Sequence, residues 1–176
     1  MSLAEKFTED EIFLLSTTPS LIGSSMAFAE GSGLGTVKEI FSSAKSVMSG
    51  IKQYPDNQLI QAILPNLEDR KEAMAQAKEY REKGVARMKE LGVNSHEKMR
   101  ELLIKDCQEV SRLLAEKSTP EEAAEYKEWS MSVAENVAKA AKEGGFLGIG
   151  GTQISQAEIE LFNQIAGALG TSSSLA

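Results

Sequence analysis

The chain has 176 residues, of which 41% are hydrophobic and 26% are charged, and its formal net charge is −7 at pH 7. This length and composition fit one globular domain that can bury a core. The acidic balance argues against nucleic acid as a main partner, because a phosphate backbone is bound by a basic surface. A single cysteine excludes an internal disulfide, and a single histidine excludes most metal and catalytic sites that need several such residues.

The start of the chain is polar and acidic, without the basic and then apolar pattern of a signal peptide. The longest apolar stretch, residues 21–29, contains glycine and serine and is too short to cross a bilayer. We therefore expect a cytoplasmic protein with no membrane span. Contact with a membrane surface is not expected either, because no basic cluster surrounds the apolar glycine-rich segment described below.

The first third of the chain predicts three helices. Thr8 and Glu11 have the spacing of a capping box, which starts a short first helix. Pro19 predicts a break and a second helix, because proline is tolerated in a first turn but not in a helix interior. The third helix is predicted from Thr36 to about Gly50, where apolar residues recur every three or four positions.

The middle of the chain predicts a turn over residues 54–57, a short helix closed by Pro65, and then a helical hairpin over residues 66–117. Gly92 separates the two arms of this hairpin, and Asn94 with Glu97 starts the second arm. The first arm is rich in charge and carries one narrow apolar stripe with near-heptad spacing, which predicts packing on a single neighbouring helix. The stripe consists of Leu67, Met74, Ala77, Gly84, Val85, Met88 and Leu91.

The last third predicts two helices. A long helix begins at Thr119–Pro120 and places Tyr126 and Trp129 on its apolar face, as core residues. The final helix opens at Ser155, with Glu158 in the capping-box position, and ends at Gly170. The Ser-rich residues 171–176 predict an unordered tail.

The segment 143–151, Glu-Gly-Gly-Phe-Leu-Gly-Ile-Gly-Gly, joins these two helices. It follows a helix instead of a strand and lacks the Lys-Ser or Lys-Thr of a phosphate-binding loop, so a buried connection is the preferred interpretation. Residues 29–35 repeat its Glu-Gly pattern before another capped helix. The pattern suggests an internal repeat, in which 8–50 and 119–170 are related units.

Four carboxylates flank these two loops and could together hold a hard divalent cation: Glu30, Glu39, Glu143 and Glu158. Helix capping explains Glu39 and Glu158 without any ligand, and the sequence has no Asp-x-Asp series typical of a calcium loop. We therefore prefer capping and keep a metal site as the alternative. No other cofactor is expected.

The remaining candidates for chemistry have ordinary structural interpretations. His96 lies in a predicted first turn among charged residues, which indicates a solvated surface position. Cys107 lies near an apolar stripe beside Asp106, and an acidic neighbour raises the pKa of a thiol, so we expect a packed and unreactive residue.

The 143–151 loop, the Ser-x-Ala-Glu at 155–158 and the opening Phe7-Thr8-Glu9-Asp10-Glu11 together resemble an uncharacterised family of small bacterial helical proteins. This resemblance implies a helical fold and no particular activity. More distantly, the Ile-Ser-x-x-Glu at 154–158 is similar to tellurite-resistance B-like helical domains, which are associated with metal ions. Those domains have Asp-Gly where this chain has Gly150-Gly151, so the acidic ligand that the resemblance implies is missing.

We predict an all-α bundle of about seven or eight helices, forming a single domain over residues 1–170 with the 66–117 hairpin inserted at its centre. The sequence contains no nucleophile–base pair, cofactor fingerprint or basic patch. We therefore expect a non-enzymatic cytoplasmic module that acts through protein–protein contacts, with a homodimer as one form of such contact. The alternative is a divalent-metal-responsive protein of the tellurite-resistance B-like type.

Overall fold

The computed structural model describes residues 3–29, 36–66, 68–142, 154–173 and 175. These residues form an all-α bundle without strands, as predicted. The helices are α1 (Leu3–Lys6), α2 (Glu9–Ala27), α3 (Thr36–Gln53), α4 (Gln58–Ile63), α5 (Arg70–Glu90), α6 (His96–Lys117), α7 (Pro120–Lys142) and α8 (Gln156–Leu169).

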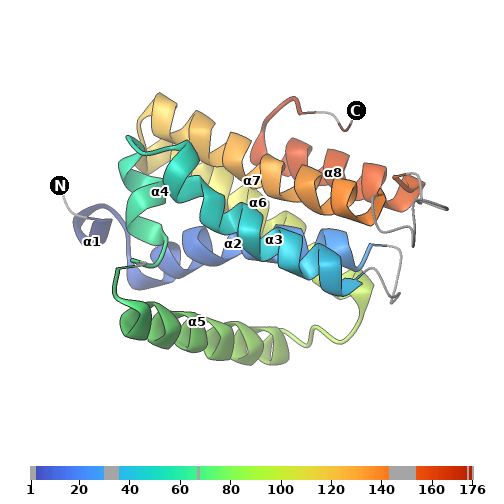
Figure 1. Ribbon diagram of the computed structural model, residues 1–176, viewed down its shortest axis with the longest axis horizontal. Coiled ribbons are helices and arrows are strands. Elements are labelled where there is room, and N and C mark those ends of the chain that lie inside the picture. The colour runs from blue at the N-terminus through green and yellow to red at the C-terminus, as the bar shows by residue number, and fades with distance from the viewer. Residues whose placement is uncertain (1–2, 30–35, 67, 143–153, 174, 176) are drawn as a thin grey trace.

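Helices α2 and α7 organise the bundle. α7 packs along both α2 and α3, while α6 packs on α2 and on α8 (Figure 1). Tyr126 and Trp129 of α7 are fully buried where these helices meet, together with Phe162 of α8. Helix α5 runs along one edge of the bundle, visibly separate from the other long helices (Figure 1).

The capping boxes predicted at two helix starts are confirmed, and the structure shows a third. Thr8 caps α2 with Glu11, and Ser155 caps α8 with Glu158. At α7 the backbone N–H of Thr119 donates to Glu122 over 3.0 Å, and the N–H of Glu122 donates to the Thr119 hydroxyl over 3.1 Å. Each box provides acceptors for backbone N–H groups that have no partner at a helix start. Because both residues of a box lie three positions apart, the pattern can be recognised in the sequence.

The predicted break at Pro19 is wrong, because α2 continues through this residue to Ala27. A proline inside a helix leaves the carbonyl four residues earlier, here that of Leu15, without its N–H donor. The hydroxyl of Tyr126 donates to that carbonyl over 2.7 Å, within the buried core. The side chain of α7 thus replaces the hydrogen bond that the proline removes, and the two predicted helices are one.

The predicted end of α3 near Gly50 is also wrong, since the helix extends to Gln53. Gly50 is instead a site of close packing. A Cβ atom there would lie 2.6 Å from Nε1 of Trp129, whose indole N–H donates to the Val47 carbonyl over 3.2 Å. Glycine therefore lets the indole ring lie directly on the helix backbone.

The connection between α5 and α6 differs by one residue from the prediction. Ser95, not Asn94, caps α6, and its hydroxyl accepts from the N–H of Lys98 over 3.2 Å. Gly92 ends the preceding helix with a φ of 64°, as expected of a left-handed glycine after a helix. The predicted hairpin of α5 and α6 is not confirmed, because these two helices are not among the pairs that pack extensively. The internal repeat stays a prediction, because residues 30–35 and 143–153 lie outside the described part of the chain. Leu175, in the predicted tail, is half-buried against the core.

Candidate functional site: helix α5 and the groove it covers

Helix α5 has well-formed ends. The carboxylate of Asp69 accepts hydrogen bonds from the N–H groups of Lys71 and Glu72, both at 3.0 Å. Arg87 and Lys89 lie in the last turn, where positive charge favours the C-terminal end of the helix dipole. The helix is therefore defined by local signals as well as by its contacts with the bundle.

No residue of α5 is buried, although the helix is 21 residues long. Met74 is 75% exposed, Val85 is 56% exposed and Leu91, just after the helix, is 52% exposed. In a globular protein most helix stability comes from burying one apolar face. An apolar stripe that stays this exposed is a feature of α5 that the fold alone does not explain.

One attachment of α5 to the bundle is to the start of α2. The rings of Tyr80 and Phe13 meet edge to face, with centroids 5.5 Å apart. The ammonium of Lys83 lies 2.8 Å from a carboxylate oxygen of Asp10 and 4.8 Å from the centre of the Phe13 ring. The hydrogen bond from Lys83 lowers the pKa of Asp10 below its ordinary value. Because this ion pair is exposed, it contributes little to stability.

A second attachment is to α6. The guanidinium of Arg87 donates two hydrogen bonds to Asp106, at 2.7 and 2.6 Å. The Asp106 side chain is only 4% exposed, so this fork-to-fork pair neutralises a carboxylate that is almost out of water. The same pair raises the pKa of Arg87. Arg87 is therefore the strongest polar attachment that we identify between α5 and the bundle.

Between α5 and the bundle lies a cavity of about 460 Å³. Phe13 of α2, Val47 of α3, Ile63 of α4 and Leu102 of α6 are among its apolar lining, and all four are buried. From α5 the lining includes Ala77, Tyr80, Arg81, Gly84, Val85 and Met88. The volume lies in the range of ligand pockets, which are also mostly apolar.

The stripe predicted from sequence thus turns toward this groove through Ala77, Gly84, Val85 and Met88. The stripe was expected to pack on a single neighbouring helix, and the structure instead places it opposite several helices. Four helices supply the groove, and the stripe lies over it without becoming buried. At Gly84 an added Cβ would meet nothing closer than Cζ of Phe13, at 4.0 Å, which shows how loosely α5 is packed here.

Helix α5 is also distinct in charge. It carries seven basic and four acidic side chains, a net charge of +3 in a chain whose total is −7. The rest of the chain therefore has a net charge of −10. A locally basic helix on an acidic protein favours contact with an acidic surface.

The four carboxylates proposed as a metal site are only partly within the described residues. Glu30 and Glu143 lie outside them, and Glu39 lies in α3 in a stretch whose side chains are not described. Glu158 is 4% exposed, and its carboxylate accepts a hydrogen bond from the Ser155 N–H over 2.8 Å. It therefore caps the start of α8, which is the interpretation preferred from the sequence. Among the described residues, no three His, Cys, Asp or Glu side chains gather as a metal site would require.

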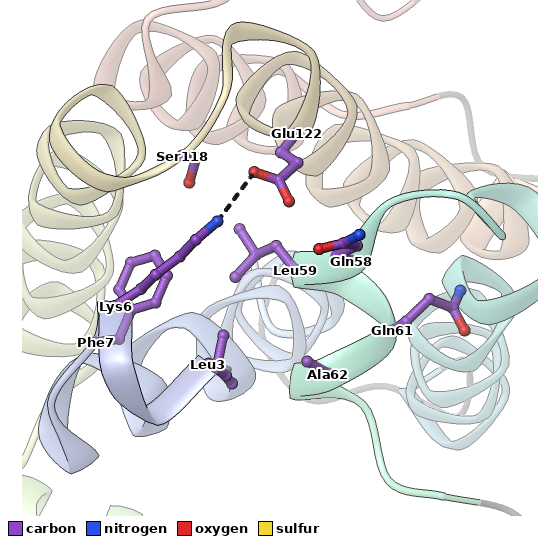
Figure 2. Close-up of a pocket in the computed structure, with 9 residues that line it drawn as sticks. All are labelled: Leu3, Lys6, Phe7, Gln58, Leu59, Gln61, Ala62, Ser118 and Glu122. Atoms are coloured by element: carbon purple, nitrogen blue, oxygen red, sulfur yellow. Dashed lines mark ion pairs between the residues drawn. The ribbon is translucent and has the colours of Figure 1, made fainter. Parts of the chain in front are cut away.

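A second cavity, of about 370 Å³, lies among α1, α4 and α7 (Figure 2). Leu3, Phe7 and Leu59 supply its apolar surface, and the ammonium of Lys6 reaches toward the carboxylate of Glu122 over 4.0 Å. The Glu122 carboxylate is already used in the α7 cap. The residues of this cavity join α1 to the bundle, and no arrangement for chemistry is formed there by the described side chains.

The remaining candidate residues behave as predicted. Cys107 is fully buried, and burial together with the neighbouring Asp106 carboxylate raises the pKa of its thiol to about 12. The thiol is therefore protonated at neutral pH and poorly nucleophilic. His96 is exposed at the start of α6, where its ring stacks on Phe28 at a centroid distance of 6.4 Å.

Sequence reasoning did not find the Arg87–Asp106 pair or Arg81 at the cavity. Both arginines lie in a run of alternating charges that reads as a solvated helix face, and nothing in their spacing marks them out. The available signal was the apolar stripe, which indicated the face of α5 that lies over the groove.

Compared with models of known protein families, with curated proteins and with solved structures, the chain matches none of them. Within the described ranges, none of the helices combines the length and the apolar character that crossing a membrane requires.

Proposed function

We propose that this protein is a non-enzymatic cytoplasmic module that acts through protein–protein contacts, and that α5 presents its contact surface. The observation that carries the proposal is the complete absence of buried residues in a 21-residue helix with exposed apolar side chains. Met74 and Leu91, near its two ends, lie outside the lining of the groove cavity and are open to a partner.

The charge of α5 supports an acidic partner surface. With a net charge of +3, the helix is attracted to negative surfaces, and the acidic remainder of a second copy of this chain is one such surface. A homodimer, in which α5 of each protomer meets the acidic body of the other, is therefore the first form of contact to test.

Two potential nucleophiles of the core are unavailable for catalysis, in keeping with the proposal. The Cys107 thiol is buried and protonated, and the Tyr126 hydroxyl is fully buried and bonded to a backbone carbonyl. Neither group can reach a substrate without disruption of the core.

Sedimentation velocity at low and high salt tests the proposal. We expect self-association that weakens with salt, because exposed charge pairs are screened. A Met74→Glu, Leu91→Glu double variant changes only exposed positions of the α5 surface and is expected to be monomeric. Phe28→Glu, at an apolar side chain that is 39% exposed outside α5, is the matched control and is expected to associate like the unmodified protein.

Two results together would contradict the proposal. The protein would be monomeric at every protein and salt concentration, and affinity capture would enrich no protein with the unmodified chain over the Met74→Glu, Leu91→Glu variant. Self-association that is disrupted by Phe28→Glu and not by the double variant would also contradict it, since the interface would then lie elsewhere.

A further inference from the structure

The cavity beneath α5 has a lining that suits an apolar chain. Leu102, Val47 and Ile63 are buried side chains of the bundle that face it, and Tyr80 and Met88 of α5 close it from the other side. The cavity is open to solvent on the α5 side, and its volume of about 460 Å³ and mostly apolar lining are those of a candidate ligand site.

Two of the four serine and threonine hydroxyls in the lining are engaged within α2. Ser16 donates to the Ile12 carbonyl and Thr17 to the Phe13 carbonyl, both over 2.7 Å, within α2. These groups present little unmet hydrogen-bonding capacity to the cavity. Because apolar side chains make up most of the lining as well, the cavity favours a hydrocarbon chain over a fully polar ligand.

Arg81 is the one charged residue among the described residues that line this cavity. Nearby cations on α5 have partners: Lys83 pairs with Asp10, and Arg87 pairs with Asp106. No ion pair or hydrogen bond of the Arg81 guanidinium is found within the described residues. A guanidinium in this position can bind a carboxylate through two parallel hydrogen bonds.

From this combination we infer that the cavity beneath α5 binds a single-chain amphipathic anion, of the class of long-chain carboxylates. The hydrocarbon chain lies between α5 and the groove, and the carboxylate lies on Arg81. This ligand site uses the face of α5 that turns toward the bundle. It is therefore independent of the protein contact proposed through Met74 and Leu91.

Titration calorimetry with sodium decanoate, below the concentration at which it forms micelles, tests this inference. Butanoate supplies the carboxylate without the chain, and decan-1-ol supplies the chain without the charge. We expect decanoate to bind with a stoichiometry of one, butanoate to give no measurable binding, and decan-1-ol to bind more weakly.

Two substitutions in the cavity separate the contributions of charge and chain. Arg81→Gln is expected to weaken decanoate binding roughly tenfold or more and to leave decan-1-ol unchanged, as loss of a hydrogen bond to a charged group predicts. Ala77→Leu adds volume to the lining and is expected to weaken both ligands. Lys78→Gln, on the same helix outside the lining, is the charge-matched control and is expected to change neither.

Each variant is first checked for an unchanged urea unfolding midpoint, and the Met74→Glu, Leu91→Glu variant is expected to retain decanoate binding. The inference is overturned if decanoate does not bind, if it binds equally well to the Arg81→Gln and Ala77→Leu variants, or if Lys78→Gln weakens it as much as Arg81→Gln does. Tight binding of butanoate would overturn it as well.

Discussion

The hydroxyl of Tyr126 donates a 2.7 Å hydrogen bond to the carbonyl of Leu15, which is the carbonyl that Pro19 leaves without a helical donor. Burial raises the pKa of Tyr126 well above its ordinary value, so the hydroxyl keeps its proton. A residue of α7 thereby completes the hydrogen bonding of α2, and the pair connects the two central helices of the bundle.

Tyr126→Phe is expected to destabilise the protein by about 1–3 kcal/mol, because it leaves a buried carbonyl without a partner. In a Pro19→Ala background the same substitution should cost much less, since the N–H of the new alanine donates to Leu15. A double-mutant cycle by urea unfolding measures this coupling. An equal cost of Tyr126→Phe in both backgrounds would contradict the explanation given for the continuous helix.

Gly50 and Gly84 are both helical glycines, and the structure predicts opposite effects for them. Gly50→Ala would place a Cβ atom 2.6 Å from the Trp129 indole, so we expect a loss of about 1–3 kcal/mol from overpacking. Gly84→Ala meets no atom closer than 4.0 Å and should stabilise the protein by roughly 0.5–1 kcal/mol, the difference in helix propensity. Urea unfolding of both variants checks the signs, and effects of the same sign would contradict the described packing.

These residues show what the sequence could and could not reveal. Capping boxes at Thr8 and Ser155 are local, so their spacing was sufficient to find them. Pro19 and Gly50 looked like breaks because the residues that make them acceptable, Tyr126 and Trp129, lie far away in the chain. Proline and glycine do disfavour a helix interior, as the sequence analysis assumed. The contacts with Tyr126 and Trp129 that allow the helix to continue come from a distant part of the chain and cannot be seen in the local sequence.

The same distinction holds for the candidate site. The sequence shows the apolar stripe in residues 67–91, and four of its residues, Ala77, Gly84, Val85 and Met88, lie on the face of α5 that turns toward the groove, while Met74 and Leu91 do not. The residues that face this stripe could not be predicted from the sequence. They come from four helices, of which three precede α5 and one follows it in the chain. The net positive charge of α5 can also be counted from the sequence. It indicates a binding surface only because the structure shows that no residue of this helix is buried.

The two polar attachments of α5 are expected to differ in strength. Arg87→Ala leaves the nearly buried Asp106 carboxylate without its partner, and should destabilise α5 by about 2–3 kcal/mol, reduced from the cost of a fully buried pair because Arg87 is partly exposed. Lys83→Ala removes an exposed ion pair and should leave the unfolding midpoint close to that of the unmodified protein. Hydrogen exchange of α5 and urea unfolding measure both effects. Equal effects of the two substitutions would contradict this ranking.

The pair between Glu11 and Lys117 predicts a dependence of stability on pH. The Lys117 ammonium, followed by the backbone N–H of Thr8, lowers the pKa of Glu11 below its ordinary value of 4.5. A carboxylate with a lowered folded-state pKa stabilises the protein fully above its unfolded-state pKa, and loses this contribution as the pH falls through the folded-state pKa.

We therefore expect the difference in unfolding free energy between the unmodified protein and a Glu11→Gln variant to be constant near neutral pH. The difference should shrink as the pH falls below 4.5. Urea unfolding over a pH series measures it. A difference that grows on acidification would show that the sign of the predicted pKa shift is wrong.

The central claim is that α5 is attached to the bundle by a few polar and aromatic contacts and exposes a surface for binding. Native-state hydrogen exchange of α5 and α7 tests it most directly. We predict that amides in residues 70–90 exchange by local opening, well before those around Trp129 in α7, and that Arg87→Ala accelerates only the former. If both helices exchange together at the free energy of global unfolding, α5 is an integral part of the core and the account is contradicted.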